Sequence, residues 1–193
     1  ILTKAKIVAK NQFENQGQIL FAYCPELLTV EESGFEFCCS MRRFIAEKLQ
    51  IIKEKAFYGC SSLAKITTKN VRTLSKSCFD HCRSLVQLEF DLLEAIPEEA
   101  FQACSALHQI TGKNIQEVHP TAFMECSKIN VVSQNPQKNF FFFNQLDQEK
   151  LMFQEVLVDD FVERIKLRKL VAKNRFLNQY LKNDSGLLRR LEE

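Results

Sequence analysis

The residues most able to do chemistry in this sequence are its eight cysteines. Eight cysteines suggest disulfides or a zinc site, and their spacing decides between the two. Cys38-Cys39 is one close pair, and Cys78 and Cys82 form another beside His81. No second pair stands at the distance that a structural zinc site requires, and Cys82 belongs to a regular series described below. We therefore expect no metal site.

Any catalytic base would have to come from a small set of histidines. His81, His108 and His119 occupy different positions in the repeat described below, so we expect them to project at different angles. The sequence has no Gly-rich phosphate loop, nucleophile elbow or His-Glu zinc motif. It therefore predicts no catalytic residue and no cofactor site, and a protein that is not an enzyme.

Composition and charge exclude further classes. The chain has 193 residues and is 46% hydrophobic, which is enough to bury a sizeable core. Its 26 Lys and Arg against 24 Asp and Glu give a net charge of +2, too little to attract nucleic acid or an acidic membrane. No apolar run approaches the about 18 residues needed to span a bilayer. We expect no nucleic-acid partner and no transmembrane segment.

Five of the cysteines recur at intervals of 22 residues, and several apolar positions recur with them. The cysteines of this series are Cys38, Cys60, Cys82, Cys104 and Cys126. Three residues before each stands a phenylalanine: Phe35, Phe57, Phe79, Phe101 and Phe123. Further apolar positions follow each cysteine by three and by six residues, the latter being Phe44, Ile66, Leu88, Ile110 and Val132. A fixed period of this length is typical of solenoid proteins.

The first copy of the repeat can be placed in two ways. One register uses Val8, Phe13, Gln16 and Ile19, with Gln16 in the cysteine position; the other uses Phe21, Cys24, Leu27 and Val30. The sequence leaves both open.

Apolar residues at steps of three favour a coiled path over one long helix, because the repeat has no four-residue step to correct the drift of a 3.6-residue turn. Each coil would then stack on the next about 4.8 Å away, placing like side chains in internal ladders. Free cysteine packs as a small buried hydrophobe, and parallel Cβ vectors at this spacing are too far apart for a disulfide. We expect a reduced, buried column of thiols.

Two segments carry a resemblance to a known family. Ala56-Phe57-Tyr58-Gly59-Cys60-Ser61-Ser62-Leu63-Ala64-Lys65-Ile66 and the stretch from Ala100 to Ile110 are similar to the BspA-like leucine-rich repeat, whose unit runs close to I-G-x-x-A-F-x-x-C-x-x-L-x-x-I. The resemblance implies a leucine-rich repeat solenoid with one short parallel β-strand per coil, joined by turns or 3₁₀ segments. The sequence departs from the family at the Gly of this unit, where it has Glu31, Lys53, Ser75, Pro97 and His119, so a turn that needs positive φ there is in doubt.

Alternation along the expected strand identifies its outward residues. If the strand begins at the Leu position and keeps the Ile position inside, the residues two and four after the Leu face outward. These positions vary in chemistry, whereas the inward ones repeat, and such variation suits recognition of another macromolecule. The candidate partner-binding residues are Arg43, Lys65, Thr67, Gln87, Glu89, Gln109 and Thr111, with Ile45, Val131 and Ser133 at the remaining outward positions.

Regularity ends near Pro136, and we divide the chain there. Residues 1–136 form the expected solenoid of five to six coils. Residues 137–193 form a Phe-rich junction, beginning with Phe140-Phe141-Phe142-Phe143, and an α-helical segment over 147–182, because this stretch is rich in Leu, Glu, Lys, Arg and Gln and lacks Pro and Gly. This segment is predicted either to cap the solenoid or to act as an arm that binds a partner.

The predicted function is a non-catalytic scaffold for protein–protein interaction, with contacts along the strand face. The alternatives are an intracellular regulatory adaptor that acts through its C-terminal helices and, as the resemblance implies, a cell-surface protein for adhesion or host contact. A thiol-rich core suits a reducing compartment, so we expect a cytoplasmic location. A secreted or cell-surface location is the alternative if an export signal precedes Ile1.

Overall fold

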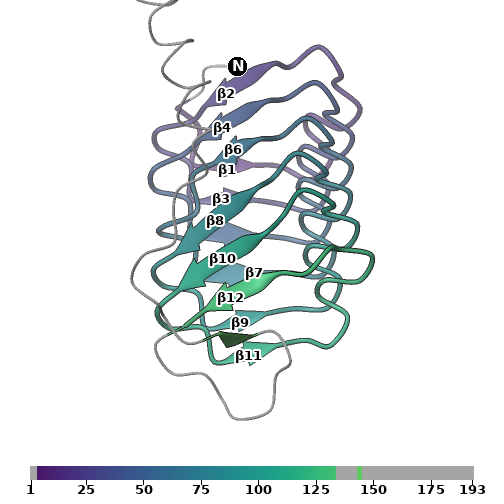
Figure 1. Ribbon diagram of the computed structural model, residues 1–193. Coiled ribbons are helices and arrows are strands. Elements are labelled where there is room, and N and C mark those ends of the chain that lie inside the picture. Colours follow the sequence, from purple (N-terminus) through teal and green to yellow (C-terminus); the bar gives the residue numbers. More distant parts are fainter. Residues whose placement is uncertain (1–3, 134–142, 145–193) are drawn as a thin grey trace, which may run out of the picture. The chain divides into compact units, whose positions relative to one another are not determined.

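The computed structural model describes residues 4–133 and 143–144. They form a parallel β-solenoid of about six coils, each coil being one turn of the chain around the solenoid. Every coil has two short strands, which stack into a front row and a back row (Figure 1). The front row consists of β2 (Phe21–Tyr23), β4 (Arg43–Ile45), β6 (Lys65–Ile66), β8 (Gln87–Phe90), β10 (Gln109–Gly112), β12 (Asn130–Val132) and β13 (Phe143–Asn144). The back row consists of β1 (Ile7–Val8), β3 (Thr29–Val30), β5 (Ile51–Ile52), β7 (Thr73–Leu74), β9 (Ala95–Ile96) and β11 (Glu117–Val118).

The parallel arrangement is as the repeat predicts, but the prediction of one strand per coil was wrong. The strands of both rows pair in the 22-residue register, with Thr29 beside Ile7 and Arg43 beside Phe21. The back strands are two residues long, which is too short to show the alternation by which a strand is recognised in a sequence. The second strand of each coil was missed for that reason.

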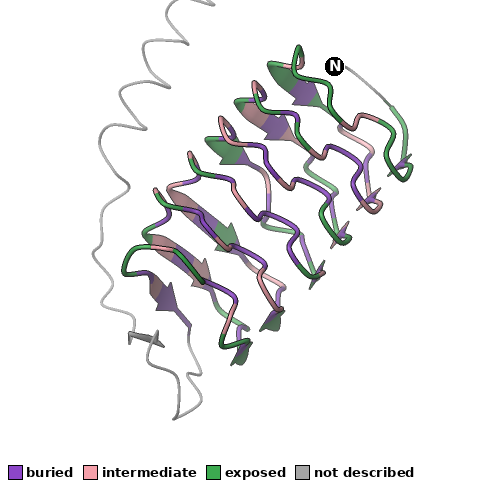
Figure 2. Ribbon diagram, turned by 90° about the vertical axis from the view of Figure 1, so that its right-hand side faces the viewer, coloured by how far each residue is buried: buried purple, intermediate pink, exposed green. Residues whose placement is uncertain are grey.

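Stacked phenylalanine rings fill the interior between the two rows. Phe57 and Phe79 lie 5.4 Å apart between ring centroids with an interplanar angle of 7°, and Phe79 and Phe101 lie 5.4 Å apart at 6°. These rings are fully buried. Figure 2 shows the alternation of buried and exposed residues along each strand that results. Such aromatic pairs stabilise a core by about 0.5 to 1.5 kcal/mol each beyond the burial of their area.

The structure decides between the two registers of the first coil. Phe13 stacks on Phe35 at 5.0 Å, and Val8 pairs with Val30. The register that uses Val8, Phe13, Gln16 and Ile19 is therefore confirmed. The competing register was wrong, since Phe21 lies at the surface with 40% of its area exposed.

The tight turns do not occur where the family's Gly would place them. Positive φ falls two residues later, as at Lys55 (53°), and again at the residue before each repeated cysteine, as at Gly59 (68°). The other members of these two series are Asn11, Ser33, Ser77 and Glu99, and Asn15, Phe37, His81, Ala103 and Glu125. The turns are thus made largely without glycine.

The last coil departs from the 22-residue register. Gln109 pairs with Gln87, 22 residues before it, but with Asn130, 21 residues after it. This slip brings Val131, which is fully buried, into register with Ile110. The prediction that Val131 and Ser133 face outward was therefore wrong. Ser133 is buried too, and its hydroxyl donates a hydrogen bond to the main-chain oxygen of Ile115 at 2.6 Å.

The chain divides into two compact units, residues 1–146 and 147–193. Within the first, β13 pairs with β12, with Phe143 beside Val131. The helical segment predicted over 147–182 and the rest of the Phe-rich junction lie outside the described residues. In the described part of the chain, no helix has the length and apolar character needed to cross a membrane.

Candidate functional site

The front row of strands presents the candidate partner-binding residues on its outer surface. The parallel register places Arg43 beside Lys65 on neighbouring strands. It also places Gln87 beside Gln109, and Glu89 beside Thr111. Thr67 directly follows β6, and its backbone N–H donates to the main-chain oxygen of Phe44 at 3.1 Å. We call the outward residues of β2, β4, β6, β8 and β10, together with Thr67, the front face.

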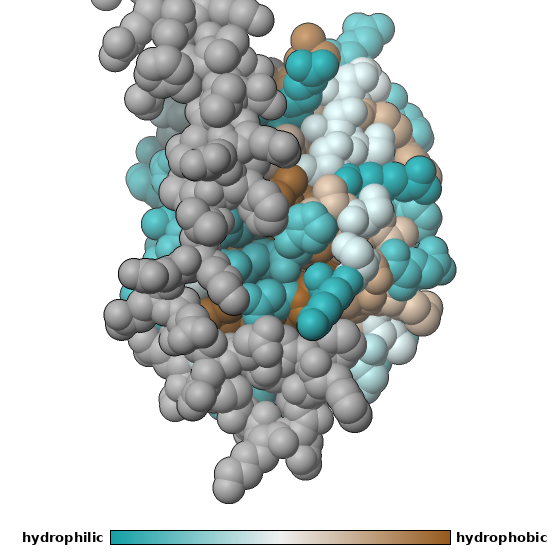
Figure 3. Space-filling model, viewed as in Figure 1, coloured by the Kyte–Doolittle hydropathy of each residue, from teal (hydrophilic) through white to brown (hydrophobic). Residues whose placement is uncertain are grey.

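These side chains differ in exposure and in partners. Lys65 and Glu89 are exposed, whereas the other five candidates are half-buried. The Glu89 carboxylate forms an ion pair with Lys69 at 3.1 Å, and the Gln109 Nε2 donates to the Thr111 hydroxyl at 3.2 Å. Figure 3 shows hydrophilic and hydrophobic residues side by side on this side of the solenoid, so it is a mosaic rather than one apolar area.

The front face divides into two sheets between the third and fourth coils. β2, β4 and β6 form one, and β8, β10, β12 and β13 form the other. At the division, the Thr68 hydroxyl donates to the main-chain oxygen of Glu89 at 2.6 Å. The candidates thus separate into a group around Arg43 and Lys65 and a group on β8 and β10.

Three surface residues of the first coil were missed by the sequence reasoning. Leu20, Phe21 and Tyr23 are 62%, 40% and 40% exposed, and Phe21 and Tyr23 pair with Arg43 and Ile45 of the next strand. One period subtracted from the outward positions Arg43 and Ile45 gives these two aromatics. They were overlooked because Phe21 was a candidate for the core in the competing register.

The repeated cysteines form a buried column that makes regular hydrogen bonds. Each thiol donates to the main-chain oxygen of a phenylalanine in the preceding coil, as Cys60 does to Phe35 and Cys104 does to Phe79, both at 3.1 Å. Burial raises the pKa of Cys60 and Cys104 well above the usual value, because a thiolate is poorly solvated in the core. All eight cysteines are free thiols, and those of the column pack as core residues.

The histidines are not brought together with a nucleophile in a common site. His81 contacts Asp80 through its Nδ1 at 2.7 Å, and burial raises the pKa of that carboxyl. His119 contacts Thr121 through its Nδ1 at 2.9 Å, and His108 is an exposed residue before β10. Across residues 4–133, no group of three or more His, Cys, Asp or Glu is placed to hold a metal ion.

Solved structures with a similar fold include two bacterial leucine-rich repeat proteins. The crystal structure of the leucine-rich repeat protein of T. pallidum has a TM-score of 0.52 and 21% identity over 65% of this chain and 66% of that one. A leucine-rich repeat protein from Bacteroides ovatus ATCC 8483 has a TM-score of 0.50 and 24% identity over 64% of this chain and 37% of that one. This chain therefore spans less than two thirds of either relative, and the likeness shows the fold alone.

A comparison with curated proteins gives no match. The family profile of the BspA type leucine-rich repeat region matches residues 28–145 in six copies, which is more than half of the chain. Proteins with this repeat and fold are typically scaffolds without enzymatic activity. The repeated core, the parallel coils and this match lead to one conclusion: the chain belongs to the BspA-type leucine-rich repeat family.

Proposed function

We propose that the protein is a non-catalytic scaffold that recognises another protein along its front face. Membership of a leucine-rich repeat family indicates an interaction scaffold. The finer assignment to the front face is supported by one observation. Neighbouring outward residues such as Arg43, Lys65 and Gln87 differ in chemistry, whereas the core position between them keeps a large apolar residue in every coil from Phe44 onward.

The fold gives such a surface the rigidity that recognition requires. Adjacent parallel strands lie about 4.8 Å apart, so the outward residues of successive coils form fixed rows. Their backbones are held by the sheet and their inward neighbours by the core, so little conformational entropy is lost when a partner binds. A scaffold of this kind uses its extended surface for recognition and needs no cleft.

The experiment is site-specific photo-crosslinking with the full chain. A benzophenone amino acid replaces Gln87 or Gln109 on the front face, and Glu117, an exposed outward residue of back strand β11, in the control. We expect one protein from the native source to crosslink at both front positions and not at the control. Substitution of Gln109 by Arg should reduce that crosslink at Gln87. Crosslinking that favours Glu117, or that ignores the Gln109 substitution, would overturn the proposal.

The other predicted roles keep the standing that the sequence gave them. Cell-surface adhesion and an adaptor function through residues 137–193 stay predictions. So does the cytoplasmic location, which follows from the buried free thiols.

A further inference from the structure

The first three coils carry an apolar and basic area on the front face. Its apolar members are Leu20, Phe21 and Tyr23 at β2 and Ile45 at the end of β4; its basic members are Arg42 and Arg43 at β4 and Lys65 on β6. We call these seven residues the N-terminal patch. Among the described residues, six large hydrophobic side chains are exposed, and three of them belong to this patch. Large apolar groups at a surface commonly mark an interaction site.

The patch has positive charge and no carboxylate among its members. Arg42, Arg43 and Lys65 supply three cations. The nearest printed acid on the neighbouring corner is Glu26, whose carboxylate is already paired with Lys48 at 2.7 Å. The front face of the following coils differs, since its outward residues are neutral apart from Glu89. The division between the two front sheets therefore coincides with a change in charge.

One row of the patch places an aromatic ring and two cations in sequence. Phe21 pairs with Arg43, and Arg43 pairs with Lys65, on three adjacent strands. Neighbours in this row are about 4.8 Å apart, close to the rise of about 3.3 to 3.6 Å for each residue of an extended chain. A peptide that crosses the strands would thus present one apolar side chain to Phe21 and acidic side chains to Arg43 and Lys65.

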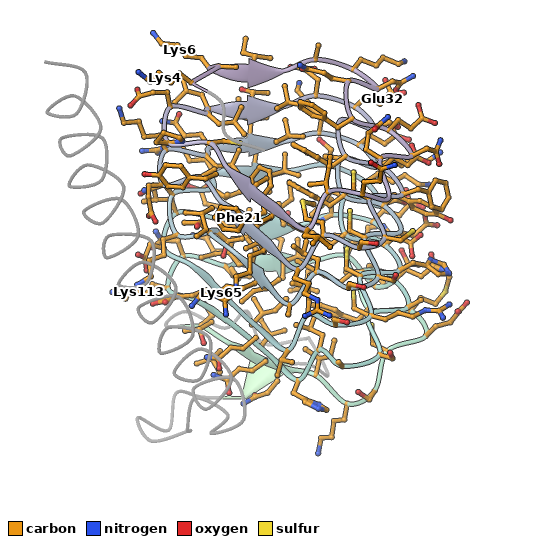
Figure 4. All side chains as sticks on the ribbon, turned by 90° about the horizontal axis from the view of Figure 1, so that it is seen from above. Lys4, Lys6, Phe21, Glu32, Lys65 and Lys113 are labelled. Carbon is orange, nitrogen blue, oxygen red and sulfur yellow. The ribbon has the colours of Figure 1, made fainter. Side chains whose placement is uncertain are left out.

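We propose that the N-terminal patch binds an acidic segment of a partner protein in which apolar residues adjoin Asp or Glu. The inference rests on the proposed function and names the partner class for this half of the front face. Aromatic and arginine side chains dominate the binding energy of protein interfaces, and the positive patch complements a negative partner. Figure 4, viewed along the solenoid, shows Lys65 on the opposite side from Glu32, an acid of the turn edge.

A nucleic acid fits these observations less well. Proteins that bind duplex DNA with strong salt dependence commonly neutralise about six to ten phosphates, and the patch has three cations. The net charge of +2 supplies no wider field to steer a polyanion. Leu20 and Ile45, which flank the aromatics, favour aliphatic or aromatic side chains over phosphate.

The test measures fluorescence anisotropy of labelled peptides with the full chain. The probe is a 12-residue peptide of four Phe-Glu-Asp units, compared with one of Phe-Gln-Asn units and with a 12-nucleotide poly(U) RNA. We expect saturable binding of the acidic peptide, weakened about tenfold between 50 and 500 mM salt because surface charge pairs are screened. Equal affinity for the Phe-Gln-Asn peptide, or tighter binding of the RNA, would overturn the proposal.

Matched substitutions locate the binding. Arg43→Glu with Lys65→Glu should weaken binding about tenfold or more, whereas Lys113→Glu, an exposed lysine just after β10, should have little effect. Phe21→Ser should weaken binding, whereas Phe37→Ser, which removes a ring of similar exposure from the turn edge, should not. Thermal unfolding of each variant checks its fold, and light scattering excludes a second copy as the occupant.

The outcomes separate this proposal from the wider one. If the acidic peptide binds equally well to all variants, or if the chain binds itself through the patch, the N-terminal patch is not the site that we propose. Crosslinks from Gln87 and Gln109 to a partner would then still support the front face. If both experiments fail, front-face recognition itself is wrong.

Discussion

The Sγ atom of Cys82 lies 3.1 Å from the main-chain oxygen of Phe57 in the preceding coil and donates a hydrogen bond to it. Cys38 makes the same contact with Phe13 at 3.1 Å, and Cys126 makes it with Phe101 at 2.9 Å. Five coils are thus joined to their predecessors by the same thiol-to-carbonyl contact. The cysteine column fills space in the core and also satisfies a buried carbonyl, a role that serine's larger polarity or alanine's missing donor would change.

The thiols of the column should resist alkylation in the folded protein. Cys60, Cys82 and Cys104 are fully buried, whereas Cys39 is exposed. With iodoacetamide at neutral pH we expect rapid labelling of Cys39 and labelling of the three buried thiols only after unfolding, measured by mass spectrometry of peptides. Labelling of Cys82 at the rate of Cys39 would contradict the inward column.

The free energy of unfolding should fall as the pH rises above about 9. Burial raises the pKa of Cys38 from 9.0 to about 11, and those of Cys60, Cys82 and Cys104 well above 9.0. Below pH 9 the thiols are protonated in both states, so their contribution is constant. Above it the unfolded thiols ionise first, which favours the unfolded state by up to about 1.4 kcal/mol per pH unit for each thiol.

Urea titrations between pH 7 and 10.5 measure this loss. Cys82→Ala should lower stability at pH 7 but reduce the slope above pH 9. Cys39→Ser, which removes an exposed thiol, serves as the control and should leave the slope unchanged. A slope that is the same in the wild-type protein and in Cys82→Ala would exclude the buried thiol as its cause.

Phe79→Ala should reduce the free energy of unfolding by about 3 to 5 kcal/mol, because it leaves a cavity between the rings of Phe57 and Phe101. Phe37→Ala, at a ring that is 41% exposed, is the comparison and should cost much less. Chemical denaturation measures both. A loss below about 1 kcal/mol for Phe79→Ala would be incompatible with a core ring.

The periodic core could be predicted from the sequence because each ladder uses one residue type. Phe57, Phe79 and Phe101 recur with their cysteines, and no other arrangement buries them all alike. The slip at β12 could not be predicted, because Val131 and Val132 are equally suited to the inward position. The positions of the turns could not either, since Lys55 has no intrinsic preference for the positive φ that it adopts.

The front face was predictable in part. Alternation gave Arg43, Lys65 and Gln87 as outward residues, and the structure places them on the outer surface. Tyr23 and Phe21 were missed because the first coil lacks the repeated cysteine that marks the register elsewhere. The division into two sheets depends on hydrogen bonding between coils, which no residue pattern reports.

Gly59 occupies a position that no side chain fits without rearrangement. Its φ is +68°, and an added Cβ would lie 2.6 Å from the ring of Phe37. We expect Gly59→Ala to cost about 1 to 2 kcal/mol from the left-handed backbone alone, and more from the clash. In the double variant with Phe37→Ala the clash disappears, so a double-mutant cycle should show a coupling of at least about 0.5 kcal/mol. Strict additivity would show that the ring moves aside freely.

Lys55→Gly should stabilise the protein. Lys55 holds a φ of 53°, which costs a side-chain-bearing residue about 1 to 2 kcal/mol, and glycine relieves this at the expense of greater freedom in the unfolded chain. A net gain of about 0.5 to 1 kcal/mol is expected from thermal or chemical unfolding. Lys53→Gly, at an exposed residue without positive φ two positions earlier, is the matched control and should be destabilising. Equal losses for both would refute strain at Lys55.

The backbone ties between coils run in both directions. Along the strands the later coil donates to the earlier one, as the N–H of Arg42 does to the oxygen of Leu20, whereas along the turn edge the earlier coil donates to the later, as Phe35 does to Ala56. Every coil therefore presents the same mixture of donors and acceptors to either neighbour. A 22-residue unit can be duplicated or deleted in the gene while all remaining hydrogen bonds find partners, so the length of this solenoid is free to vary during evolution without refolding its neighbours.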